Sequence, residues 1–179
     1  MNGRGDKGFT LIELLIVVAI ISIIAAIAVP GLLRARMTGN ETSAIASLKV
    51  TTSSQVAYSA VCGNGGYASS YQVLGTAPGA DPNAEAFISK DLGHAAPVQK
   101  SGYDFDLVAG TGSSPGPNDC NGTATNSAWY ASAEPQTPGT TGSRAFAVNT
   151  GNTIWQNTDP SGTAPTEPFT ASATVSVIQ

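Results

Sequence analysis

The chain has 179 residues, which suits one compact domain with an added element and is too short for two ordinary domains. Charged residues make up 11% of it and the formal net charge is −4, so the chain as a whole lacks the basic footprint of a nucleic-acid-binding protein. Its first third is apolar and predicts a helix. Residues 62–179 are rich in Gly, Ser, Thr, Asn and Pro, and predict a loop-rich β domain outside the cytoplasm.

A short polar segment, residues 1–8, precedes an unbroken apolar run over residues 9–29. A helix of that length is roughly 30 Å long, about the thickness of a bilayer's hydrocarbon core. Arg4 and Lys7 lie before the run, which predicts that the N terminus faces the cytoplasm. The alternative is a secretory signal peptide. That would need a small-residue cleavage site after the run, where residues 30–34 read PGLLR instead.

One acidic residue, Glu13, lies inside the apolar run. Insertion scales put the cost of a carboxylate at the bilayer centre at about 2.5–3.5 kcal/mol. Two interpretations remain open. Either Glu13 lies at the depth of the lipid headgroups and is solvated there, or a specific cation meets it.

The order Gly8, then Phe9-Thr10-Leu11-Ile12-Glu13, then a long apolar run to Pro30 resembles the N-terminal signature of type IV pilins. The resemblance implies that a membrane peptidase cuts between Gly8 and Phe9, and that the same enzyme methylates the new amino group of Phe9. It assigns roles in assembly to Phe9, Glu13 and Pro30. It also implies the pilin fold, an α+β architecture in which a long N-terminal helix packs on a small antiparallel sheet.

Cleavage would place a free amine on Phe9, one helical turn from Glu13. The two charges could pair within one chain. Between chains, the pairing would neutralise a carboxylate in an apolar medium and so set the register of an incoming subunit. Pro30 has no N–H to donate and predicts a kink or a locally melted stretch; a plain exit from the membrane is the other interpretation.

We therefore expect four segments along the chain. They are a leader peptide at 1–8, a transmembrane and filament-core helix at 9–33, an amphipathic helical half at 34–61, and a loop and antiparallel sheet domain at 62–179.

Within the amphipathic half, a modestly apolar helix face is expected to lie on the globular domain. Thr38-x-x-Glu41 is a capping-box pattern beside Gly39, so a helix break there is possible, although the continuous helix of type IV pilins argues against it. The run Cys62-Gly-Asn-Gly-Gly should end the helix. The residues that form the predicted face are Ile45, Leu48, Thr52 and Val56.

Residues 63–100 predict a loop with short helices, because Pro and Gly interrupt them repeatedly. Alternating apolar residues and a Gly151-Asn152 turn signal then predict a series of strands, and the sheet of pilin-like proteins is similar. The predicted strands are 101–109, 128–133, 144–149 and 153–157, with a possible edge strand within 171–178.

Cys62 and Cys120 are the two cysteines. They predict one disulfide in an exported domain, since two thiols and the single histidine, His94, cannot complete a zinc site. Asp104 and Asp106 mimic the start of a calcium loop, but the Gly and Glu that should follow are missing, so the outward face of a strand is the better interpretation. We expect no catalytic residues, no metal and no cofactor, and hence no enzyme.

The expected function is that of a structural subunit of a type IV pilus, a homopolymer used for adhesion or twitching motility. Its partners would be other pilin subunits, the prepilin peptidase, the pilus assembly machinery and the inner membrane that holds the precursor. The mature chain would lie in an extracellular surface filament.

Two alternatives stay open. A type II secretion pseudopilin usually carries an acidic calcium loop, and residues 157–170 hold only Asp159 and Glu167. A minor pilin that binds DNA during uptake would need a basic patch. The cations beyond residue 50 are only Lys90, Lys100 and Arg144.

Overall fold

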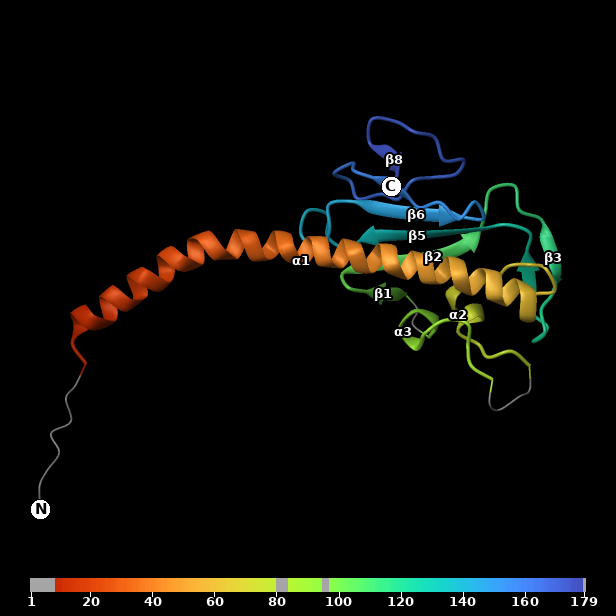
Figure 1. Ribbon diagram of the computed structural model, residues 1–179, viewed down its shortest axis with the longest axis horizontal. Helices are drawn as coiled ribbons and strands as arrows, with labels where there is room; N and C mark the ends of the chain where they lie inside the picture. Colours follow the sequence, from red (N-terminus) through yellow and green to blue (C-terminus); the bar gives the residue numbers. More distant parts are fainter. Residues whose placement is uncertain (1–8, 80–83, 95–96, 179) are drawn as a thin grey trace, which may run out of the picture. The chain divides into compact units, whose positions relative to one another are not determined.

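The computed structural model describes residues 9–79, 84–94 and 97–178. The chain divides into two compact units, Met1–Arg36 and Met37–Gln179, and each is described by itself. One helix, α1 (Leu11–Val61), belongs to both units and is labelled in Figure 1. It is helical at Pro30 and at Gly39, so the break considered near Gly39 does not occur.

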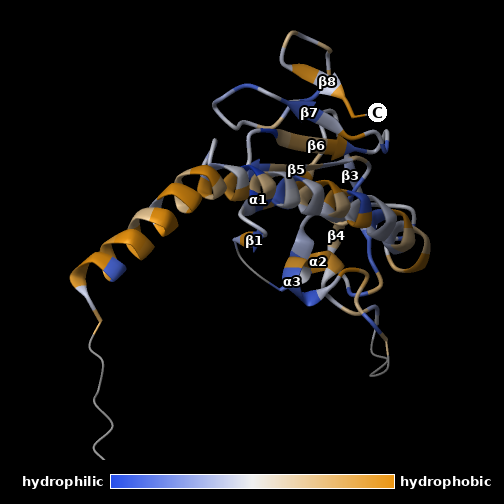
Figure 2. Ribbon diagram, turned by 60° about the vertical axis from the view of Figure 1, so that its left-hand side comes forward, coloured by the Kyte–Doolittle hydropathy of each residue, from blue (hydrophilic) through white to orange (hydrophobic). Residues whose placement is uncertain are grey.

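The first unit consists of the apolar part of α1. Every large apolar side chain from Phe9 to Leu33 is at least 44% exposed. Figure 2 shows this part of the helix as hydrophobic along nearly its whole length. An 18-residue window of α1 has a mean hydropathy of 3.0, and none of it is buried in the protein. By length and composition, α1 is therefore able to cross a membrane.

The second unit is a six-stranded antiparallel sheet with the remainder of α1 on one face (Figure 1). The strand order is β1-β2-β5-β6-β7-β8, and a separate hairpin pairs β3 with β4. The predicted α+β class is thus confirmed. The strands are β1 (Val98–Lys100), β2 (Tyr103–Ala109), β3 (Pro115–Asn118), β4 (Ala124–Asn126), β5 (Trp129–Pro135), β6 (Ala145–Asn149), β7 (Trp155–Asn157) and β8 (Val175–Val177), and the short helices are α2 (Tyr71–Leu74) and α3 (Lys90–Gly93).

The core lies between α1 and the sheet. Its largest fully buried side chains include Trp129, Tyr103 and Phe146 from the sheet and Tyr58 from the helix. Strand β2 alternates buried and exposed residues, as expected for a sheet with one face covered by a helix. Burial of these aromatic rings removes a large apolar area from water, which stabilises the unit.

The buried face of α1 differs in part from the predicted one. Leu48 is fully buried as expected, but Val56 is 53% exposed. Small and polar residues take much of the contact instead, and fully buried Gln55 pairs with the backbone N–H and C=O of Ala68 at 2.9 and 3.0 Å. The hydropathy pattern missed this face because its polar groups find partners on the domain. The buried residues of α1 are Glu41, Ala44, Ser47, Leu48, Thr51, Ser54, Gln55 and Tyr58.

The opposite face of the sheet is partly covered by the segment that joins β7 to β8. The Tyr130 hydroxyl donates to the Pro165 carbonyl at 2.7 Å, and the rings of Trp155 and Phe169 stack with centroids 5.5 Å apart. This segment packs a second, smaller apolar cluster on that face, built around Ala145 and Ala147 of β6.

Candidate functional site

The first residues of the apolar helix form a reciprocal hydrogen-bonded cap. One carboxylate oxygen of Glu13, Oε2, accepts from the Thr10 backbone N–H at 2.9 Å and from the Thr10 hydroxyl at 2.7 Å. In return the Glu13 N–H donates to the Thr10 hydroxyl oxygen at 3.3 Å. Thr10 directly precedes α1 and Glu13 is its third residue, so this is a capping box.

The sequence carried the signal for this cap. Thr10-Leu11-Ile12-Glu13 matches the same T-x-x-E pattern as Thr38 and Glu41. Glu13 was predicted to meet a specific cation or to be solvated, and neither interpretation foresaw Thr10 as its partner. The cap gives the carboxylate two donors within its own chain, which lowers the cost of placing it among apolar side chains.

The other predicted assembly residues occupy simple positions. Phe9 is 83% exposed, and Pro30 lies inside α1. Gly8, the residue expected before the cut, lies outside the described residues. The pairing of a Phe9 amine with Glu13 concerns the cleaved chain and stays a prediction.

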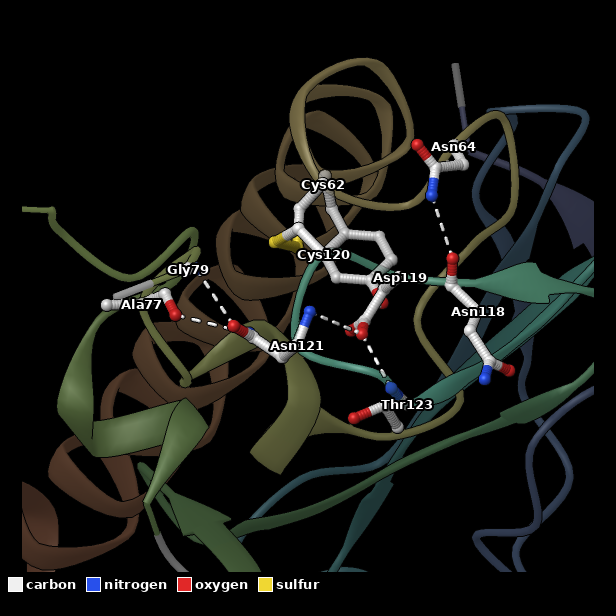
Figure 3. Close-up of a disulfide and its surroundings, with 10 residues drawn as sticks. Cys62, Asn64, Ala77, Gly79, Asn118, Asp119, Cys120, Asn121 and Thr123 are labelled. Carbon is white, nitrogen blue, oxygen red and sulfur yellow. Dashed lines mark hydrogen bonds between the residues drawn. A yellow bond between two sulfur atoms is a disulfide. The ribbon is translucent and has the colours of Figure 1, made fainter. Parts of the chain in front are cut away.

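The far end of α1 is tied to the β3–β4 hairpin by the predicted disulfide, Cys62–Cys120, which is confirmed. The Cys120 N–H also donates to the Cys62 carbonyl at 2.8 Å. Figure 3 shows the hydrogen bonds that surround the disulfide. Asn64 donates to the Asn118 carbonyl at 2.8 Å, while Asn121 accepts from the Gly79 N–H at 2.8 Å.

Asp119 is the polar centre of this cluster and is 6% exposed. Its Oδ1 accepts from the backbone N–H groups of Asn121 and Thr123 at 2.9 and 2.7 Å, and its Oδ2 accepts from the Tyr58 hydroxyl at 2.7 Å. Burial, followed by the bond to Asp119, raises the pKa of Tyr58, so the phenol keeps its proton and remains a donor. Helix end and hairpin are therefore joined covalently and by buried hydrogen bonds.

Asp104 and Asp106 both lie exposed on β2, as the strand interpretation predicted. Asp104 accepts from the Gln136 side chain at 2.9 Å, and Asp106 accepts from the Leu107 N–H at 2.9 Å. Within residues 9–79, 84–94 and 97–178, no three His, Cys, Asp or Glu side chains gather closely enough to hold a metal ion.

Comparisons with known proteins address the N-terminal segment. The family described as "Prokaryotic N-terminal methylation motif" matches residues 3–29. The type IV wide pilus major component PilA4 of Thermus thermophilus is 53% identical over 55 residues, which is 31% of this chain and 42% of that relative. The chain thus spans less than half the length of the relative that it matches. No solved structure matches the chain. The methylation motif thus overlaps the apolar part of α1, and the rest of that helix packs on an antiparallel sheet.

Proposed function

We propose that this chain is a type IV pilin, the structural subunit of a type IV pilus, held in the inner membrane as a precursor and then polymerised through α1 into an extracellular filament for adhesion or twitching motility. Type IV pilins are structural proteins, so no reaction is assigned to the chain. Its partners in this proposal are other pilin subunits, the prepilin peptidase and the pilus assembly machinery.

One observation carries the proposal. The apolar side chains of α1 from Phe9 to Leu33 are exposed along the whole segment, although water would drive them into any available interior. A lipid bilayer would cover these apolar side chains before assembly, and a bundle of identical helices would cover them afterwards. The same exposed surface therefore supports both a membrane-held precursor and a helical polymer.

The proposal divides the chain as its sequence suggested. Residues 1–8 form the leader, 9–33 the membrane and filament-core helix, 34–61 the helical half that meets the domain, and 62–179 the globular part. Cleavage between Gly8 and Phe9 leaves N-methyl-Phe9 as the first residue. Two features support this division: the methylation motif matches residues 3–29, and the buried residues of α1 begin only at Glu41.

Isolation of surface filaments tests the function. Mass spectrometry of sheared filaments should identify this chain as their main component, with an N-terminal peptide that starts at N-methyl-Phe9. An intact Met1, or a cut beyond Pro30, would contradict the processing. Recovery of the chain only from periplasmic or membrane fractions, with no surface filament, would favour the secretion pseudopilus.

A further inference from the structure

Helix α1 first becomes buried in the globular unit at a carboxylate. Met37 and Asn40 are half-buried, the preceding residues of α1 are exposed, and Glu41 is only 5% exposed. A charged side chain is rarely buried unless it is paired. The first buried residue of the helix on the sheet is therefore a charged one, although half-buried Met37 precedes it.

Four donors meet the Glu41 carboxylate. Oε1 accepts from the backbone N–H and the hydroxyl of Ser143, both at 2.8 Å. Oε2 accepts from Nη2 and Nε of Arg144 at 2.7 and 3.0 Å. We call Glu41, Ser143 and Arg144 the helix pin. Both carboxylate oxygens are satisfied, so any displacement of Glu41 breaks several charge-assisted bonds together.

The cation of the helix pin is itself held in place. Its Nη1 donates to the Gln156 side-chain oxygen at 2.8 Å, and its guanidinium lies 5.5 Å from the centroid of the Phe146 ring. The Tyr103 hydroxyl donates to the Arg144 carbonyl at 2.7 Å. Strands β2, β6 and β7 thus fix the position at which Arg144 meets the helix.

Two hydrogen bonds flank the helix pin on α1. The Asn40 side chain donates to the Thr141 carbonyl at 2.9 Å, and the hydroxyls of Ser43 and Ser101 lie 2.9 Å apart. The helix is therefore joined to the β1–β2 turn and to the segment that enters β6. All these contacts lie within the second unit.

Beyond the helix pin, the large buried side chains of α1 are Leu48, Gln55 and Tyr58, and the first of them lies about two helical turns after Glu41. Ala44, Ser47, Thr51 and Ser54 are small, and interlock less deeply with the sheet than Leu or Phe would. A buried ion pair adds little net stability over an apolar pair, but a slip along the helix would leave the buried Glu41 carboxylate without its partners.

We propose that the helix pin fixes the axial register of α1 at the N-terminal end of its contact with the sheet, away from the disulfide at Cys62, and takes the load that a filament transmits along α1 to the globular unit. The part that concerns load rests on the proposed function, whereas the part that concerns register does not. Separation of the helix from the sheet, starting at its N-terminal side, has to break the bonds of Glu41 before it reaches the fully buried apolar residues Ala44 and Leu48.

A cross-link tests the register in the full chain, solubilised in detergent. Ser43→Cys and Ser101→Cys place two thiols where the hydroxyls are 2.9 Å apart, and mild oxidation should join them. In a Glu41→Leu/Arg144→Met background, the apolar pair should keep the urea midpoint close to that of the parent. The cross-linking rate should nevertheless fall about tenfold, which corresponds to about 1.4 kcal/mol of lost register preference.

Lys100→Gln is the matched control, since it breaks the more exposed Lys100–Asp91 ion pair, also 2.7 Å long, in the same unit. It should leave the cross-linking rate unchanged. An equal cross-linking rate in the parent and in the apolar double variant would show that the helix pin does not fix the register of α1. If the double variant does not fold, Arg144→Gln replaces it, and hydrogen exchange at Ala44–Lys49 should rise while exchange in β5 stays constant; unchanged exchange at Ala44–Lys49 would overturn the register.

Pulling single filaments tests the load. Filaments of the double variant should lengthen at a lower force than parental filaments, and those of Lys100→Gln should behave like the parent. Equal forces would overturn the part of the proposal that concerns load. A parental chain that builds no filament would overturn both that part and the proposed function, while the cross-link would still decide the register.

Discussion

In the proposed filament, the Glu13 carboxylate would have to enter a membrane first and then meet a specific partner. Thr10 supplies two donors to it in the uncleaved chain. Cleavage at Gly8–Phe9 would add an amine one turn away, and a neighbouring subunit would offer another. The carboxylate can then exchange its internal bonds for an ion pair during assembly, which would select the register as each chain docks.

We predict that Glu13→Val inserts in the membrane at least as well as the parent, because it removes a buried charge. It should assemble poorly, since apolar helices slide past one another without a preferred register. Glu13→Gln keeps the shape and some hydrogen bonding, and should fall between the two. The ratio of surface filament to membrane-held subunit measures the effect. A normal filament yield from Glu13→Val would mean that apolar packing alone sets the register.

The cap predicts a separate effect of Thr10. Thr10→Val keeps the shape but removes the hydroxyl, and should cost about 1 kcal/mol of stability at the start of α1. Thr10→Ser retains the hydroxyl and is the control. Hydrogen exchange at Leu11–Leu14 of the uncleaved chain in detergent should rise in the Val variant and stay close to the parent in the Ser variant. Equal exchange in both would show that the hydroxyl does not cap the helix.

Glu41 should make the globular unit sensitive to acid. Burial raises its pKa, but the bonds from Ser143 and from the Arg144 guanidinium outweigh that effect, so the pKa lies below its usual value. A lowered folded pKa stabilises the protein above the unfolded pKa, and this contribution is lost as the pH falls through the folded pKa. Arg144 is the charged group that faces Glu41, and Tyr103 is the nearby phenol.

We therefore predict that Glu41→Gln is less stable than the parent at pH 7, and that the difference shrinks as the pH falls below about 4.5. Urea unfolding of both proteins at several pH values measures it. Lys100→Gln again serves as a control, because it leaves the carboxylate of Glu41 intact. A difference that is constant with pH would show that ionised Glu41 does not stabilise the unit.

At the scale of elements, one local pattern has two outcomes along α1. Thr10-x-x-Glu13 forms a capping box at the start of the helix, whereas Glu41 of Thr38-x-x-Glu41 bonds Ser143 and Arg144. Sequence alone cannot separate them, because the choice depends on partners about a hundred residues away. Helix α1 continues through Gly39, where the local pattern allowed a break, because helix propensity and tertiary contacts stabilise it there.

Some strands could be predicted from the local sequence pattern, and others could not. The predictions at 101–109, 128–133, 144–149 and 153–157 are confirmed by β2, β5, β6 and β7, because alternation reports one buried face. Strand β1 was missed because Val98 is its one apolar residue, so it shows no alternation. Hairpin β3–β4 was missed because Pro115 and Pro117 argue against a strand.

The disulfide joins the end of α1 to the β3–β4 hairpin, and we predict its effects on thiol labelling and on the free energy of unfolding. Both cysteines should resist thiol labelling in the folded chain without denaturant. Reduction should lower the free energy of unfolding by about 4 kcal/mol in the chain-entropy model, since the bond closes a separation of 58 residues. Urea unfolding followed by fluorescence of buried Trp129, with and without reductant, checks this. Labelling of both thiols in the native protein would show that the bond does not form.

At the scale of the whole molecule, the two units suit different surroundings. The exposed large apolar residues of the described second unit are only the scattered valines 50, 56, 61, 108 and 177. Residues 37–179 contain four Lys and Arg against ten Asp and Glu, a formal charge of −6 that favours solubility. Within the first unit, by contrast, the apolar surface is continuous from Phe9 to Leu33.

We predict that residues 37–179 expressed alone fold as a soluble α+β domain, because the cut at Arg36–Met37 removes the exposed apolar helix and keeps the helix pin, the core and the disulfide. Export to an oxidising compartment should yield a monomer by size-exclusion chromatography, with a cooperative urea transition. A fragment starting at Ala44 is the comparison: it loses Glu41 and the flanking bonds of Asn40 and Ser43, leaves Arg144 without its carboxylate partner, and should unfold at a lower urea concentration. If residues 37–179 aggregate or lack a cooperative transition, the globular unit depends on the membrane half of α1 for its folding.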